Sequence, residues 1–365
     1  MFPPISSHIY ARERLALAPV VRADWPGQDF IVDLDKADRD EQQEFSAYII
    51  SQGMTGHWLS HATGQAAWDD SHFFTLLRQR QQLEVMRYLA QRRALDIIER
   101  RFTAHDIPYA VMKGAHTREL LYANPAIRPS VDIDVLIAPE HRFKAVETLA
   151  AAGFTLRINP ATISHEVSLN DTLAGIDLHW DILRPGRALR NLACEMLERR
   201  ARLRDFFALR AEDELFLLLF HPVFTKYLTT PHARLANIAD LFRWGKTMPI
   251  NWTELCRLCA RHHFTTAAWL VTSHMKVLTD SQDFDDFIAV MRPKAVKAAW
   301  LGYWLRENYS SRFLDRPWLI QAFFTLPAHD RWRDALRFLG VWQGGQRAIN
   351  EERRLLSRAA EVGGQ

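Results

Sequence analysis

The residues best suited to chemistry are two aspartates placed two positions apart in an apolar run. Residues 131–137 read VDIDVLI, so Asp132 and Asp134 alternate with four apolar side chains. Alternate side chains of a strand share a face, and both carboxylates would therefore lie together. Their repulsion is relieved by a divalent cation, for which hard oxygen ligands favour Mg²⁺. The alternative is an edge strand with a solvated acidic face, which is the commoner origin of an isolated pair.

A second acidic run supplies a third carboxylate. Residues 175–183 read GIDLHWDIL, which places Asp177, His179 and Asp181 on one strand face. If this strand neighbours the first, Asp177 comes opposite the aspartate pair. Three carboxylates on one sheet face suit two-metal phosphoryl transfer, in which the third holds the ion that activates the attacking hydroxyl. His179 could orient a carboxylate, contact a phosphate, or only hydrogen-bond within a half-buried sheet.

A possible phosphate-binding turn precedes both runs. In VMKGAHTREL an apolar strand ends at Lys113-Gly114 and a helix begins. Such a turn presents backbone N–H groups and a cation to phosphate oxygens, and glycine allows a close approach. Arg128, in the loop before the aspartates, could also reach a triphosphate. Plain turns often contain Lys-Gly, and loop arginines are usually solvated, so these two assignments are hypotheses.

The pattern of the elements predicts a mixed α/β sheet followed by helices. A long helix is expected at about 70–105 and another from Pro139 to Gly153, with short helices around Gly53 and an irregular arm before residue 35. Predicted strands cover 108–112, 131–137, 154–158, 165–169 and 176–182. After residue 185 we predict helices at about 187–207, 211–228, 232–246, 252–262, 264–278, 283–305, 316–325 and 330–358.

This order predicts three regions and an α+β or α/β fold class. An N-terminal arm with short helices would occupy residues 1–75, a catalytic domain with a small mixed sheet 76–185, and an all-helical domain 186–365. The nucleotide and its acceptor would bind between the sheet and the helical domain. His221 and Asp240 in that helical region could contact the base or the acceptor, or be paired polar residues inside a helical packing layer.

Composition favours a cytoplasmic protein without a strong charge field. The 365 residues carry a net charge of +3 and are 48% hydrophobic, so a core can form and a long nucleic acid is not an expected partner. Three cysteines are too few for a disulfide framework. The N-terminus lacks the pattern of a signal peptide, and no apolar run is long enough to span a membrane.

Together, the motifs resemble the uncharacterised bacterial branch of the polymerase-beta-type nucleotidyltransferase superfamily. The resemblance lies in MKGAHTRELLYANPAIRPSVDIDVLI, the later IDLHWDI, LFHPVFTKY and RLANIADLFRW, and it covers about 75–245. It implies that Asp132 and Asp134 bind two Mg²⁺ ions, that Asp177 completes the site, and that Lys113-Gly114 replaces the family's glycine turn. The implied substrate is an NTP, with ATP as the first candidate.

The expected reaction moves a nucleoside monophosphate from the NTP to an acceptor hydroxyl and releases pyrophosphate. The acceptor would be a small molecule, a peptide or a protein. Two other readings stay open: a module that binds nucleotide without catalysis, and a helical interaction protein such as one half of a toxin–antitoxin pair. An intact cluster of three carboxylates favours the enzyme, because a module that only binds gains little from so costly a group of charges.

Overall fold

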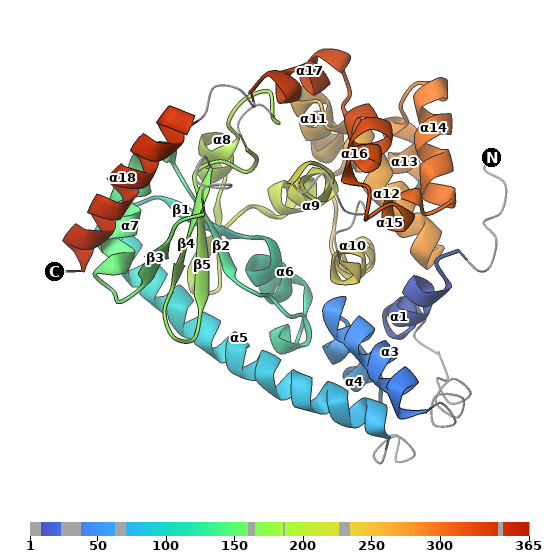
Figure 1. Cartoon of the computed structure of the whole chain (residues 1–365), viewed down its shortest axis with the longest axis horizontal. Coiled ribbons are helices and arrows are strands. Elements are labelled where there is room, and N and C mark those ends of the chain that lie inside the picture. Colours follow the sequence, from blue (N-terminus) through green and yellow to red (C-terminus); the bar gives the residue numbers. More distant parts are fainter. Residues whose placement is uncertain are drawn as a thin grey trace.

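A computed structural model describes residues 9–22, 38–62, 71–159, 165–184, 187–225, 234–341 and 346–364. Within them, one seven-stranded sheet has the order β3-β4-β5-β2-β1-β7-β6. Figure 1 shows helix α5 running along the sheet, α7 and α18 beside it, and the later helices gathered on the other side. The predicted combination of a small mixed sheet with a large helical region is confirmed.

The five predicted strands are present, and two more extend the sheet. The strands are β1 Tyr109–Met112, β2 Ile133–Ile137, β3 Thr155–Arg157, β4 Glu166–Asn170, β5 Gly175–His179, β6 Ala201–Leu203 and β7 Phe206–Ala208. Strand β2 pairs antiparallel with β1 and parallel with β5, while β4 pairs antiparallel with both β3 and β5. The two aspartate-bearing segments are therefore direct neighbours, as the site requires.

Most predicted helices form close to their expected ends. The helices are α1 Ala11–Val21, α3 Arg39–Ser51, α4 Thr55–Ala62, α5 His72–Ala104, α6 Lys113–Leu121, α7 Arg142–Ala150, α8 Ala193–Glu198, α9 Ala211–Thr225, α10 Leu235–Thr247, α11 Trp252–His262, α12 Thr265–Thr279, α13 Asp285–Met291, α14 Ala295–Arg306, α15 Tyr309–Arg312, α16 Pro317–Ile320, α17 Trp332–Val341 and α18 Gln346–Gly363. Short 3₁₀ turns lie at Pro125–Ile127, Pro139–His141 and Leu326–Ala328, and a π-helical turn at Gln321–Thr325.

The single helix expected over 283–305 is divided into α13 and α14, and two further predictions about these elements were wrong. The helix expected over 187–207 is only α8, and β6 and β7 follow it, because Val111 of β1 pairs with Ala208 and recruits this segment to the sheet. The supposedly irregular arm contains α1, whose Leu17 is fully buried in the helical core. Tertiary partners decide both cases, since neither segment has a strong periodic pattern of its own. The predicted boundary at residues 185 and 186 lies outside the described residues.

The two faces of the sheet pack against different cores. Ile133, Val135 and Ile137 point into an apolar cluster with α5 and α7. Leu136, with the opposite orientation, belongs to the larger cluster formed with the helical region. Asp134 alternates with the first set, so its carboxylate lies on the face turned toward the helical region. Among the described helices, none combines the length and apolar character needed to cross a bilayer.

Candidate metal and nucleotide site

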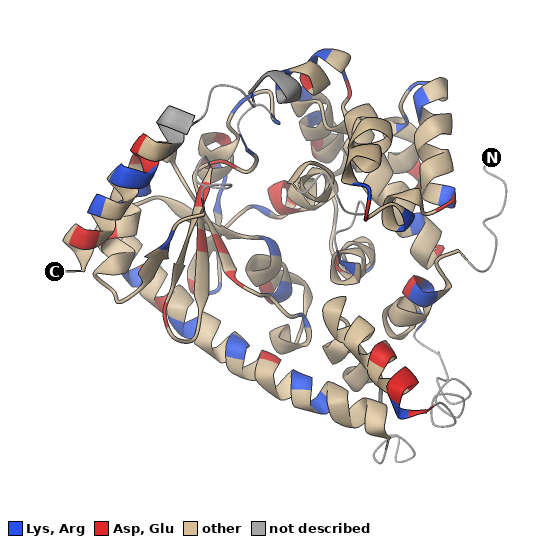
Figure 2. Ribbon diagram, in the orientation of Figure 1, with Lys and Arg blue, Asp and Glu red and all other residues tan. Residues whose placement is uncertain are grey.

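A row of polar side chains crosses four neighbouring strands of the sheet. Strand register places Asp134 of β2 opposite Asp177 of β5, Asp177 opposite Ser168 of β4, and Ser168 opposite Arg157 of β3. Directly opposed residues share a face, so all four project from the same side. Ser168 donates its hydroxyl to Asp177 Oδ1 at 2.6 Å. Figure 2 shows the acidic positions collected on the central strands, between helices of mixed charge.

Asp134 is the most enclosed carboxylate of the row. Its Oδ1 accepts a hydrogen bond from Lys113 Nζ at 2.6 Å and lies 2.9 Å from His179 Nε2. Burial by itself raises the pKa of Asp134, but the charges and hydrogen bonds of Lys113 and His179 outweigh it and hold the pKa below its usual range. His179 Nδ1 is 3.1 Å from Glu166 Oε2, so the imidazole lies between two carboxylates. The structure brings His179 into contact with a carboxylate of the site, which is compatible with orienting Asp134.

Asp132 completes the acidic cluster from the turn just before β2. Burial and then the negative charges of Asp134 and Asp177 raise the pKa of Asp132 to about 7. Ligand atoms of Asp134, Asp177 and His179 lie within 4.8 Å of one another, which is close enough for one cation to contact all three. A buried carboxyl whose pKa is raised further by two neighbouring carboxylates is an arrangement whose repulsion a divalent ion would relieve. These donors fit Mg²⁺, and His179 adds one nitrogen to the oxygen set.

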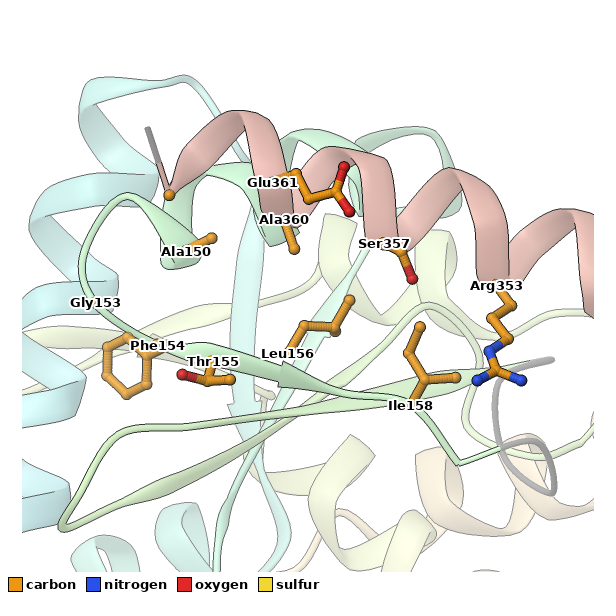
Figure 3. A pocket seen from close by; sticks show the side chains of 11 residues that line it. Ala150, Gly153, Phe154, Thr155, Leu156, Ile158, Arg353, Ser357, Ala360 and Glu361 are labelled. Carbon is orange, nitrogen blue, oxygen red and sulfur yellow. The ribbon is translucent and has the colours of Figure 1, made fainter.

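The cluster borders a hollow of about 410 Å³ on the surface of the sheet. Its lining is Val131, Asp132, Arg157, Ile158, Asn159, Ser168, Asn170, Gly175 and Asp177. A larger hollow of about 580 Å³ lies between β3 and α18. Figure 3 shows Leu156 and Ile158 on its β3 side, with Ser357 and Glu361 projecting from α18. Only one carboxylate, Glu361, lines this second hollow, so it lacks the donors of a metal site.

The Lys-Gly turn is built differently from the phosphate-binding turn that the sequence suggested. Lys113 has a left-handed backbone, with φ of 55°, at the first residue of α6. Its N–H donates to Glu214 Oε2 at 3.0 Å, and Thr117 Oγ1 donates to Glu214 Oε1 at 2.9 Å. The fully buried Glu214 carboxylate therefore occupies the start of α6, where a phosphate was expected. The lysine side chain, not the backbone, faces the acidic cluster.

Gly114 is needed for packing at this turn. A Cβ at Gly114 would lie 2.5 Å from Ser130 Oγ and 2.8 Å from Arg128 Nη1. Glycine thus lets the turn approach the loop that leads to the aspartates. The structure gives Gly114 a role in bringing Lys113 and the aspartate strand together.

Arg128 lies beside this turn, but its guanidinium is bound inside the protein. Its Nη2 donates to Asp240 Oδ2 at 2.8 Å and to Asn237 Oδ1 at 3.1 Å, and its Nη1 to the carbonyl of Pro129 at 2.6 Å. Tyr122 also donates to Asp240, at 2.7 Å. Asp240 is 0% exposed. Arg128 and Asp240 therefore join the loop before β2 to α10. Of the two interpretations of Asp240, the structure agrees with a paired polar residue inside a helical packing layer.

His221 of α9 faces the cluster from the helical region. Burial lowers the pKa of His221 well below its usual value, and the nearby charges of Lys113, Asp134 and His179 act on it as well. His221 therefore lies within electrostatic range of Asp134 and His179. Of the two polar residues noted in the helical region, His221 lies beside the site and Asp240 does not.

Sequence reasoning missed four residues around the cluster. These are Arg157, Glu166, Ser168 and Glu214. The alternation of Glu166 and Ser168 with two buried apolar residues marks a strand face, but only the register shows that this face is the acidic one. Glu214 comes from a helix about one hundred residues further along the chain, and no local pattern connects it with Lys113.

Three aspartates of one mixed sheet lie next to a hollow and are backed by a helical region, an arrangement that suits metal-dependent phosphoryl transfer. Residues 39–280 match the family described as uncharacterised nucleotidyltransferase. The match covers more than half of the 365 residues, including the whole sheet and helices α3 to α12, and the chain belongs to this family. No curated protein and no solved structure matches the chain.

Proposed function

We propose that this protein is a Mg²⁺-dependent nucleotidyltransferase that moves a nucleoside monophosphate from an NTP to an acceptor hydroxyl. The observation that carries the proposal is the convergence of Asp132, Asp134 and Asp177 beside an open hollow of about 410 Å³. Family membership supports nucleotidyl transfer as the general activity. ATP is the first candidate nucleotide, and the cytoplasm is the expected compartment.

The three aspartates would hold two Mg²⁺ ions. Bound Mg²⁺ supplies positive charge to the phosphates and lowers the pKa of the acceptor hydroxyl. Asp177, fixed by Ser168, accepts the proton of that hydroxyl. The acceptor oxygen bonds to the α-phosphorus, the bond from that phosphorus to the β-phosphate oxygen breaks, and pyrophosphate leaves. Lys113, which contacts Asp134 at one end of the polar row, and Arg157, at the other end, would hold the triphosphate.

The acceptor is a small molecule, a peptide or a protein. It would enter between the sheet and the helical region, where His221 of α9 already lies near the carboxylates. A net charge of +3 over 365 residues provides no strong field for a long nucleic acid.

The test is a screen of the four NTPs with Mg²⁺ in which pyrophosphate release is followed against pools of acceptor compounds and peptides. Release that depends on both metal and acceptor would support the proposal. Tight NTP binding without release from any pool would point instead to a module that binds nucleotide without catalysis.

Replacing Arg157 with Ala should raise the KM for the NTP about ten- to a hundred-fold, with a smaller effect on kcat. Arg157 is exposed and lines the hollow beside Asp177, where a guanidinium can donate two hydrogen bonds to phosphate. Steady-state kinetics with varied NTP measures the effect. Arg353→Ala, which alters the separate hollow beside α18, is the matched control and should leave KM unchanged. An equal rise in the KM for the NTP in both variants would contradict this role of Arg157.

A further inference from the structure

The Lys113 ammonium contacts Asp134 Oδ1, an oxygen that a metal ion at the cluster would also bind. Its Nζ lies 2.6 Å from Asp134 Oδ1 and 3.4 Å from His179 Nε2, so it touches two of the three groups that could bind one cation. The Lys113 side chain is 18% exposed and reaches the cluster from the turn at the start of α6. This contact neutralises the most buried carboxylate of the site.

We propose that Lys113 is an internal counter-ion that a divalent metal ion displaces from Asp134 only when the triphosphate of a nucleotide receives the lysine. The inference rests on the function proposed above and deepens it, because it makes metal binding conditional on nucleotide. The ligands concerned are a divalent cation and a nucleoside triphosphate.

Electrostatics explains why the two cations exclude each other. An ammonium at 2.6 Å from Asp134 Oδ1 would repel a divalent ion bound to the same carboxylate. Lysine side chains ordinarily carry a positive charge, and the short contact of Lys113 with Asp134 makes a buried ammonium–carboxylate pair. Metal binding without nucleotide therefore requires breaking a buried ion pair and leaving the lysine unpaired.

The backbone of Lys113 is held in place, while its side chain can rotate toward a bound phosphate. The Lys113 N–H is held by Glu214, and the left-handed φ of 55° sets the direction in which the side chain leaves the turn. Rotation of the flexible four-carbon stem is then enough to move the ammonium from Asp134 to a phosphate oxygen. Since binding couplings are reciprocal, the metal should increase nucleotide affinity by the same factor as the nucleotide increases metal affinity.

Removing the charge of Lys113 should strengthen metal binding in the absence of nucleotide. Mn²⁺ serves as the probe, with the free ion measured by electron paramagnetic resonance on the full chain. We expect Lys113→Met to bind Mn²⁺ about tenfold or more tightly than the wild type, a change within the usual range of coupling. Lys113→Gln is a second neutral variant, in case the first is poorly folded.

Charge-retaining and distant variants serve as controls. Lys113→Arg keeps a cation and should bind Mn²⁺ as weakly as the wild type. Lys246→Met removes an exposed lysine paired with Asp283 and should change nothing. Adding Asp177→Asn to Lys113→Met should abolish the gain, which would locate the ion at the cluster.

A second readout uses thermal stability. Mn²⁺ alone should raise the melting temperature of the Lys113→Met variant but hardly that of the wild type, which should respond when a non-hydrolysable ATP analogue is added. Unchanged Mn²⁺ affinity in both neutral variants would overturn the counter-ion role even if the wild type releases pyrophosphate. Absence of Mn²⁺ binding in every variant, with or without the analogue, would instead overturn the proposed function together with it.

Discussion

Replacement of Asp177 with Asn is expected to slow Mg²⁺-dependent pyrophosphate release about a thousand-fold while leaving the fold at least as stable. Asparagine keeps the shape and can still accept from Ser168, but it loses the charge that would bind metal and accept the acceptor proton. Loss of about 4 kcal/mol of transition-state stabilisation corresponds to that factor. Stability should not fall, because the charge of Asp177 disfavours ionisation of Asp132 in the metal-free protein.

Pyrophosphate release and thermal melting, measured on the same preparation, check both parts of this prediction. Asp280→Asn makes the same chemical change at an exposed left-handed residue after α12, where asparagine is well tolerated. That control should retain full turnover. Wild-type turnover in folded Asp177→Asn would remove the third carboxylate from the mechanism, and a matching loss in the control would show a general effect of the substitution.

Replacement of Arg128 with Met is expected to lower the free energy of unfolding by about 3–5 kcal/mol, because it leaves a buried carboxylate without its cation. Asp240 is fully buried and takes two hydrogen-bonding nitrogens from Arg128. Of the side chains that the structure describes as hydrogen-bonded to Asp240, only Tyr122 then remains. Urea unfolding followed by circular dichroism measures the change. Arg257→Met, which removes an exposed pair with Glu254, should have a much smaller effect.

The same variant separates the two roles considered for Arg128. If Arg128 stabilises the loop, adding Asp240→Asn to Arg128→Met should restore part of the lost stability, because the unpaired charge of Asp240 is removed. The KM of the folded protein for the NTP should then change little. A large rise in KM with unchanged stability would mean that Arg128 holds phosphate, as its position in the sequence suggested.

Local sequence was sufficient where the chemistry depends on one strand or one helix. The period of two in VDIDVLI and GIDLHWDI places Asp134, Asp177 and His179 by backbone geometry alone, and Asp132 lies in the turn just before β2. The strong helical period of residues 72–104 predicts α5 for the same reason. These features need only covalent geometry and the burial of one apolar face, and both can be read from neighbouring residues.

Tertiary structure alone decided which partners those residues have. Register between β3, β4 and β5 brings Arg157 and Ser168 into the acidic row, and no pattern within either strand specifies that register. Likewise, a carboxylate of α9 holds the Lys113 turn, and one of α10 binds Arg128, the arginine that the sequence had assigned to phosphate. Such pairings follow from the packing of segments about one hundred residues apart. The acidic partner of Lys113 or Arg128 is therefore determined only when the chain has folded.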